Sequence, residues 1–302
     1  MPSASYPYAV GRVRVLEQSL LGDDKLKRLS DAPRGEFARL LGDWGFAADC
    51  PIRNDVDALV EWREHDVRDI VADVTPDPAL TDLFFMDIDA ANIKLLIKSR
   101  EMGDQQLPDL QKGVWDIELL KAAVKARDYS PLGQPIGGLL DKADCHPFVP
   151  QLLSAGVDSA IYTQIFSILK TSRDRFCTAY FKLKADCSNM TSVLRARALG
   201  YSREQLMPLL VPGGSIPAET LAEALTAESG GFHGIGLPDK FVSAAEAPNA
   251  GERINLLLTE FGQQNAYDSF GIGPVVNYAV TALGECRAIR VAYARAGKEH
   301  KI

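Results

Sequence analysis

The stretch DCSNMTSVLRARALG, residues 186–200, has an earlier counterpart in DAANIKLLIKSREMG, residues 89–103. Matching residues lie 97 positions apart, from the two aspartates (89 and 186) to the two glycines (103 and 200). Residues spaced i, i+3, i+4, i+7, i+8 and i+11 share one face of an α-helix. In both stretches that face reads Asp, Asn, three apolar residues and Arg. The spacing therefore predicts two equivalent helices, each followed by a glycine that ends it.

The polar residues of these two faces are the candidate functional residues. An Asp and an Arg eleven positions apart on one helix are separated by roughly 16 Å along its axis, too far to pair with each other. If they are buried, each needs a partner on another element, because an unpaired buried charge costs several kcal/mol. We interpret them as residues that dock helices or repeats; the alternatives are a partly solvated edge with little energetic role, and catalysis. The set comprises Asp89, Asn92 and Arg100 in the first copy and Asp186, Asn189 and Arg197 in the second.

A third and more divergent copy lies near the C-terminus. Placing Glu285 on Asp186 keeps the acid but loses the Asn and the Arg, although Arg290 lies close by. Terminal repeats often depart from the pattern because they have one neighbour fewer. Glu285 and Arg290 therefore join the candidate docking residues, and the repeats predict three helical units over residues 1–110, 111–212 and 213–302.

A second match follows each copy. GVWDIELL, residues 113–120, aligns with GSIPAETL, residues 214–221, and the two share a glycine, a bulky apolar residue two positions on, a Glu and a Leu. These segments lie 101 positions apart, so about four residues are inserted between Gly200 and Gly214. The match predicts a short helix that begins at the same place in each unit.

Helical periodicity dominates the rest of the chain. It covers residues 6–21, where Gly22-Asp23-Asp24 is expected to end the helix, residues 56–74, and a long helix over 158–183. A last helix is expected from Pro274 to about Arg295. Nothing alternates convincingly with a period of two, so the sequence predicts an all-α protein.

The composition excludes several classes of partner and site. The chain has 302 residues, 46% of them hydrophobic, and a net charge of −7 from 33 basic and 40 acidic residues. Nucleic acid is therefore a poor partner, and no polybasic block offers attachment to anionic lipid. Since no uninterrupted apolar run approaches roughly 20 residues, we expect a cytosolic protein without direct membrane insertion. Five scattered cysteines without a Cys-x-x-Cys pair predict reduced thiols and no metal site.

Sequence signals for catalysis are sparse. The chain has no Walker loop, no Gly-x-Ser-x-Gly and no His-Glu-x-x-His. The charged cluster over residues 61–69, from Glu61 to Asp69, could contain an acid–base pair, but such a run is more typical of a solvated helix face with i, i+4 pairs. We therefore expect neither an enzyme nor a cofactor.

One motif resembles a known family. The run Phe270-Gly271-Ile272-Gly273-Pro274-Val275-Val276-Asn277-Tyr278, followed by Glu285, Ile289 and Arg290, is similar to the C-type subunits of bacterial and archaeal V/A-type rotary ATPases, whose eukaryotic counterparts are the d-type subunits. Residues 6–21 with Arg12 and Arg14, residues 89–100 and residues 180–197 are also similar to that family. The resemblance thus covers nearly the whole chain.

The resemblance implies three similar helical lobes arranged as a pseudo-threefold funnel. It also implies a non-catalytic rotor subunit on the cytoplasmic face of the membrane, without a cofactor. Its partners would be the central-shaft subunits of the D/F type and the proteolipid ring, between which it passes torque. Two other interpretations of the residues stay open: a helical-repeat adaptor of another cytosolic assembly, and a helical enzyme with a dispersed active site.

Overall fold

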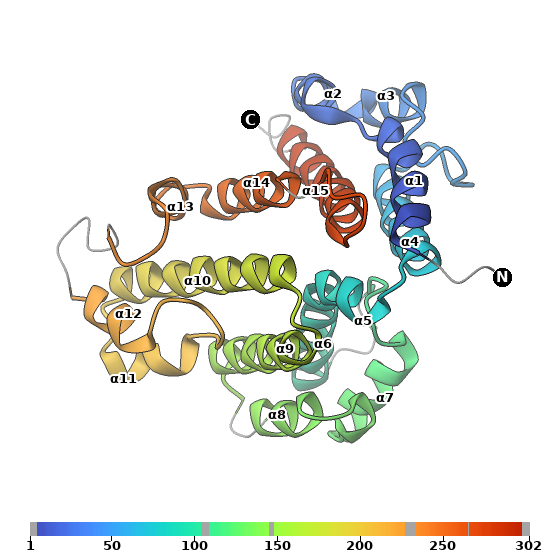
Figure 1. Ribbon diagram of the computed structural model, residues 1–302. Helices are drawn as coiled ribbons and strands as arrows, with labels where there is room; N and C mark the ends of the chain where they lie inside the picture. Colours follow the sequence, from blue (N-terminus) through green and yellow to red (C-terminus); the bar gives the residue numbers. More distant parts are fainter. Residues whose placement is uncertain (1–4, 104–108, 145–147, 227–233, 265, 298–302) are drawn as a thin grey trace. The chain divides into compact units, whose positions relative to one another are not determined.

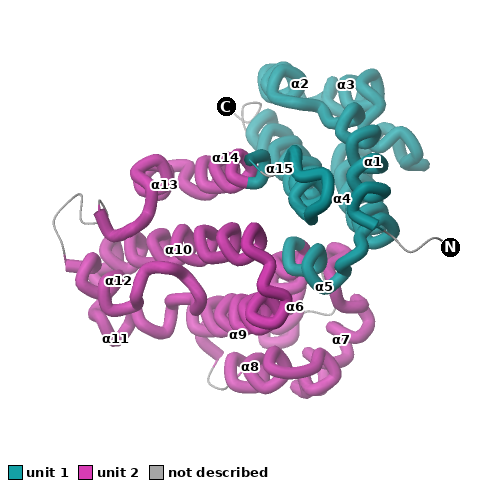
Figure 2. The backbone as a smooth tube through the Cα atoms, in the orientation of Figure 1, with its two compact units in different colours: residues 1–84, 262–302 teal, residues 85–261 magenta. Residues whose placement is uncertain are grey.

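The computed structural model describes residues 5–103, 109–144, 148–226, 234–264 and 266–297, and these contain helices and no strand (Figure 1). The prediction of an all-α protein is therefore confirmed. The chain divides into two compact units: unit 1 comprises residues 1–84 and 262–302, and unit 2 comprises residues 85–261 (Figure 2). The three-lobed funnel and the boundaries 1–110, 111–212 and 213–302 stay predictions.

Unit 1 is built around its last helix, α15 (Gly273–Ala296). This helix packs against α4 (Val56–Val74), α2 (Gly22–Ser30) and α1 (Tyr6–Leu16), while α3 (Phe37–Asp43) and α5 (Pro78–Thr81) pack on α4. Cys286 and Ile289 of α15 are fully buried against side chains from residues 21–60. The N-terminal and C-terminal parts of the chain thus share one hydrophobic core.

Unit 2 contains the two copies of the organising helix, α6 (Met86–Met102) and α10 (Arg175–Ala198). The helix α9 (Pro150–Ser172) packs against α6, α10 and α8 (Ile136–Ala143). A short helix packs on each copy, α7 (Ile117–Ala126) on α6 and α12 (Ala218–Ala224) on α10. The remaining helices are α11 (Arg203–Leu206), α13 (Asp239–Ala245) and α14 (Ala250–Gln263), the last of which crosses into unit 1.

The glycine signals have mixed outcomes. Gly103 and Gly200 follow the two organising helices with φ of 69° and 67°, as the repeat predicts. Gly22, in contrast, begins α2, and the first helix ends earlier, at Leu16, because a 3-10 turn over residues 17–19 follows it. The prediction that a glycine ends the helix is therefore confirmed for the two repeated helices and wrong for Gly22.

The prediction of one long helix over residues 158–183 is wrong. The helix ends at Arg173, which has a left-handed φ of 57° and follows the last residue of α9. Asp174 then caps α10, because its Oδ1 accepts the Cys177 N–H at 2.7 Å. The second organising helix therefore begins eleven residues before Asp186, whereas α6 begins three residues before Asp89.

One described helix, α9, is long and apolar enough to cross a membrane by length and composition alone. Its most apolar window has a mean hydropathy of 1.3, and 39% of that window is buried inside the molecule. Core helices of soluble proteins pass the same test. The expectation of no membrane insertion therefore stays a prediction.

Candidate functional site

The first organising helix, α6, binds the loop that precedes α7 through the carboxylate of Asp89. Asp89 is fully buried, and its carboxylate accepts the Val114 N–H at 2.7 Å and the Trp115 N–H at 3.3 Å. The preceding residue, Gly113, has no room for a side chain, because a Cβ there would lie 2.5 Å from Asp89 Cγ. We call this arrangement the acid–loop contact: a buried helix carboxylate that accepts backbone N–H groups from a loop.

The second organising helix makes the same contact. Asp186 is 3% exposed, and its carboxylate accepts the Ser215 and Ile216 N–H groups, each at 3.0 Å. A Cβ on Gly214 would lie 3.1 Å from Asp186 Cγ and closer still to Oδ1. Burial raises the pKa of Asp186, although the two backbone hydrogen bonds act in the opposite direction. The inserted residues between Gly200 and Gly214 thus leave the contact itself unchanged.

The two asparagines bind the same loops at a second point. Asn92 donates to the Gln111 carbonyl at 2.7 Å and accepts the Gln111 N–H at 3.2 Å. Asn189 pairs with Val211 in the same way, at 2.9 Å and 2.7 Å. Each amide side chain therefore satisfies both backbone groups of one loop residue, as a neighbouring strand would.

The two arginines bind the far ends of the short helices. Arg100 donates to the Val124 carbonyl at 2.5 Å in the last turn of α7. Arg197 donates to the carbonyls of Ala224 and Leu225 at the end of α12. A cation there adds a donor for carbonyls at the helix end and interacts favourably with the helix dipole. The Asp, Asn and Arg of one helix face thus hold a loop and a short helix at three points.

Arg100 has an additional partner that the repeat does not predict. It forms a two-pronged ion pair with Asp144 at the end of α8, at 2.6 Å and 2.9 Å, and the Asp144 side chain is only 4% exposed. Tyr129 donates its O–H to the same carboxylate at 2.7 Å. Burial, and then the bond to Asp144, raise the pKa of the Tyr129 hydroxyl. Sequence reasoning missed Asp144 because it lies outside the repeated stretches.

The third acid makes a related contact with the start of the chain. Glu285 of α15 is 5% exposed, and its Oε1 accepts the Gly22 N–H at 2.8 Å. Burial raises the pKa of Glu285, against the effect of backbone hydrogen bonds from Gly22 and Leu21. Arg290, five residues further on, forms a two-pronged ion pair with Glu64 of α4. The third acid therefore binds the first residue of a helix that precedes it in the sequence, whereas the first two bind loops that follow.

The charged cluster over residues 61–69 departs from the expected solvated face. Arg63 and Glu64 are 7% and 8% exposed, because α15 packs over this part of α4. Arg63 pairs with Asp66 at 3.0 Å and donates to the Ser19 hydroxyl, while Glu64 binds Arg290. These charges are used in contacts within unit 1 rather than arranged around a reacting group.

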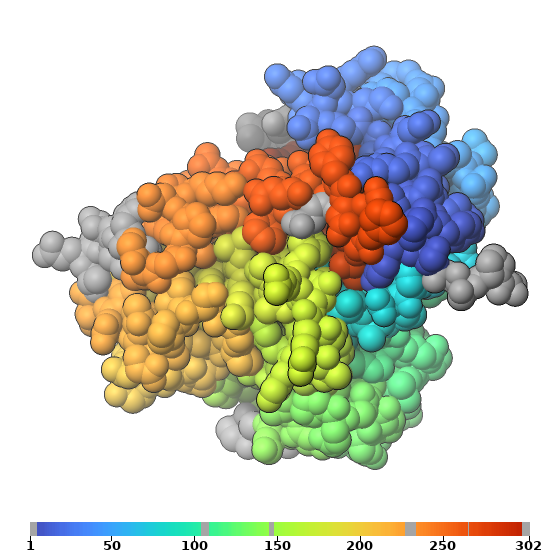
Figure 3. All heavy atoms as spheres, viewed as in Figure 1, coloured from blue at the N-terminus to red at the C-terminus, as the bar shows by residue number. Residues whose placement is uncertain are grey.

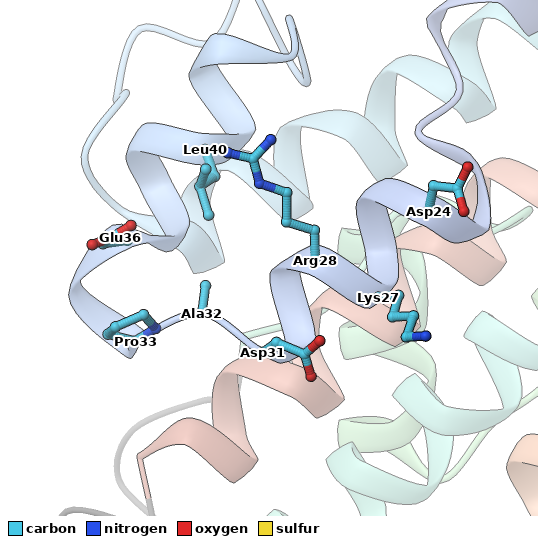
Figure 4. A pocket seen from close by; sticks show the side chains of 8 residues that line it. All are labelled: Asp24, Lys27, Arg28, Asp31, Ala32, Pro33, Glu36 and Leu40. Carbon is cyan, nitrogen blue, oxygen red and sulfur yellow. The ribbon is translucent and has the colours of Figure 1, made fainter.

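In the described part of the chain, neither the hollow beside α2 nor a cluster of metal ligands suggests another site. Within the described ranges, no three His, Cys, Asp or Glu side chains lie where they could hold a metal ion. A hollow of about 440 Å³ lies beside α2 and the start of α3. It is lined by charged residues of both signs, such as Lys27, Asp31 and Glu36 (Figure 4). It is open to solvent, and its side chains diverge rather than converge on a point. The hollow therefore suggests no catalytic arrangement.

Replacing Arg197 tests the docking role of the polar face. We expect Arg197→Met to lower the free energy of unfolding by about 1–2 kcal/mol, because it leaves the carbonyls at the end of α12 without their donor. The thioether side chain keeps much of the apolar stem. Urea unfolding measures the change, and Arg195→Met on the exposed face of α10 is the control. Equal stability of the two variants would contradict docking.

Glu285 gives the docking contact a dependence on pH. Because its pKa is raised above the ordinary value of 4.5, the native protein takes up this proton at a higher pH than the unfolded chain does. The wild type should therefore gain stability relative to Glu285→Gln as the pH falls through the raised pKa towards 4.5, and lose that gain as the pH rises. Urea unfolding of both proteins across this range measures the difference, and a constant difference would contradict the expectation.

The acid–loop contact recurs on α6 and α10, and the described residues form helices and no strand, which defines an all-α protein with an internal repeat. The chain belongs to the ATP synthase (C/AC39) subunit family, whose model matches residues 9–295. This family comprises subunits of V/A-type ATPases. The chain is also 23% identical, over 244 residues, to the C-type subunit of the A-type ATP synthase of Methanosarcina acetivorans. That match covers 70% of this chain and 64% of the relative's length.

Proposed function

We propose that this protein is a non-catalytic rotor subunit of a V/A-type ATPase or ATP synthase, and that it couples the central shaft to the membrane proteolipid ring. The observation that carries the proposal is the recurrence of the acid–loop contact on α6 and α10, in a member of this family. A coupling subunit must transmit torque without deforming, so its helices need to be fixed to one another.

The contacts supply this stiffness in a specific way. Side chains of one long helix hold each short helix at three points. For α7 these points are the preceding loop, the residues just before the helix begins and the last turn of the helix. Breaking a buried charged contact costs about 3–5 kcal/mol, because the abandoned charge stays away from water. Sliding α7 along α6 would break several of these contacts together, so a load on the short helix passes to the long one.

The proposal places the protein on the cytoplasmic face of the membrane, held there by its partners. A net charge of −7 opposes direct attraction to anionic lipid. The partners are the D/F-type shaft subunits on one side and the proteolipid ring on the other. In this role the docking residues Asp89, Asn92, Arg100, Asp186, Asn189, Arg197, Glu285 and Arg290 are structural, and the protein needs no cofactor.

Native mass spectrometry tests the proposal directly. The full chain is mixed with the purified shaft subunits of its own organism's V/A-type ATPase, and separately with the detergent-solubilised proteolipid ring. We expect a one-to-one assembly with the shaft and a single copy on the ring. If the folded protein binds neither at low or moderate salt, the coupling role is wrong and an adaptor of another assembly becomes the better interpretation.

A further inference from the structure

Two ion pairs of the organising helices occur at the same position of the repeat. The residue five positions beyond the acid is Lys94 in α6 and Arg290 in α15, and both are cations. Lys94 Nζ lies 2.5 Å from Asp158 Oδ1 of α9, and Arg290 makes its two-pronged ion pair with Glu64 of α4. Equivalent positions of two copies thus bind carboxylates on other long helices.

The helices that supply these carboxylates are themselves equivalent. The 97-residue offset moves α4 onto residues 153–171, which lie inside α9, and α9 directly precedes the second organising helix. In the same way α14 precedes the third, α15. The cation of the first copy therefore binds the long helix before the second, and the cation of the third copy binds the long helix before the first. The same order would pair the second copy, α10, with α14.

The second copy has no cation at this position. Its residue is Thr191, whose hydroxyl donates to the Cys187 carbonyl of its own helix at 2.9 Å. Lys184, seven residues earlier on α10, pairs with Asp87 of α6, the residue at the same position of the first copy. α6 is thus tied by charge to both α9 and α10, whereas the position that would tie α10 to α14 carries no charge.

Aromatic rings attach α14 to α10. The Phe261 ring is stacked on the Phe176 ring, with centres 6.3 Å apart and planes at 9°, and its centre lies 6.4 Å from that of Tyr180. Lys240 of α13 lies 3.4 Å from Glu260 of α14, which joins these two helices to each other. Figure 1 shows α14 alongside α10, and Figure 3 shows the orange surface of α13 and α14 on the face turned to the viewer. We call α13 and α14 together the latch.

We propose that the cation five positions beyond the acid locks long helices together, and that its replacement by Thr191 makes the latch the first part of unit 2 to open. Segments that open locally have few buried apolar contacts and much exposed surface, and α14 leaves Leu256 63% exposed. Opening uncovers the Phe176 and Tyr180 rings, while the ion pairs of α6 keep α9 and α10 in place. This property belongs to the isolated chain and goes beyond the proposed coupling role.

Hydrogen exchange of the full chain, measured by mass spectrometry, tests the latch. We expect the amides of α13 and α14 to exchange at least about tenfold faster than those of α9. Phe261→Leu removes the ring contacts but keeps an apolar side chain, so it should speed exchange in the latch about fivefold and leave α6 and α9 unchanged. Leu256→Gln, at an exposed position of the same helix, is the control and should exchange as the wild type does.

Salt distinguishes the ionic lock from the aromatic contacts of the latch. The Lys94 and Asp158 side chains are 28% and 37% exposed, so about 1 M NaCl should screen their attraction. We expect this salt to speed exchange in α9 about threefold and to change exchange in the latch much less. Lys94→Met should give the same increase at low salt and remove most of the salt response. Lys98→Met, which replaces an exposed cation on the same helix, is the control.

Each outcome decides one part of the proposal. If the latch exchanges no faster than α9, or if Phe261→Leu speeds exchange equally throughout unit 2, the latch does not open separately and the proposal is wrong. If Lys94→Met behaves as Lys98→Met does, the cation is not a lock. The salt comparison uses the wild type, so it decides the matter even if the Phe261 variant does not fold. None of these measurements involves the shaft or the ring, so a failure of the coupling role is detected separately.

Discussion

Gly113→Ala is expected to lower the free energy of unfolding by about 3 kcal/mol. The new methyl group would occupy space filled by the Asp89 carboxylate, and overpacking of this kind costs about 1–3 kcal/mol. If Asp89 moves aside, it loses the Val114 and Trp115 N–H groups, and an unsatisfied buried charge costs a similar amount or more. Urea unfolding measures the loss, and amide hydrogen exchange at Val114 and Trp115 should become faster as the loop is released.

Two further glycine variants calibrate this result. Gly214→Ala should have an effect of the same sign, because it meets Asp186 in the second copy of the contact. Gly251→Ala in α14 should be neutral or slightly stabilising, since nothing lies within 4 Å of its Cβ and alanine favours a helix. If Gly113→Ala is as stable as Gly251→Ala, the acid–loop contact is not a rigid feature of unit 2.

Arg100→Met should destabilise the protein by a similar amount, about 3 kcal/mol. Its loss leaves the almost completely buried Asp144 carboxylate without its closest cation, and breaking a buried ion pair typically costs about 3–5 kcal/mol. The lower value applies because Tyr129 still donates to Asp144 and the Arg127 guanidinium lies 3.5 Å away. The loss of the Val124 contact adds to the effect. Urea unfolding again provides the measurement.

A double-mutant cycle identifies the source of that loss. Adding Asp144→Asn to Arg100→Met removes the abandoned charge, so the double variant should be more stable than the arginine variant alone. Lys98→Met on the exposed face of the same helix is the control for changing a cation to methionine, and it should alter stability little. Strict additivity of the two substitutions would show that the ion pair contributes nothing.

The sequence predicted the local design of the repeats but not their long-range partners. Helical spacing brought Asp89, Asn92 and Arg100 onto one face, and the second match identified Gly113 and Gly214 as equivalent loop positions. All these signals are carried by short stretches of sequence. The docking role itself is still a prediction that the variants above examine.

The partners in other elements depend on tertiary packing, which no local pattern records. Glu285 and Gly22 lie 263 positions apart, and Arg290 and Glu64 lie 226 apart. The same reason explains why residues 61–69 were expected to form a solvated helix face. The sequence does not show that α15 packs over Arg63 and Glu64 and buries them. The break between α9 and α10 was missed because Arg173, rather than a glycine, adopts the left-handed conformation there.

The Glu285–Gly22 hydrogen bond also has a consequence for synthesis of the chain. It joins residues from opposite ends of unit 1, and the continuous unit 2 lies between them in the sequence. At about 5–20 residues per second, a ribosome needs roughly 10–40 s to travel from residue 84 to the end of the chain. During that time unit 2 can fold, while the N-terminal segment waits with the apolar side chains of Val13 and Leu29 uncovered. That waiting segment is where we expect chaperones to bind the nascent protein.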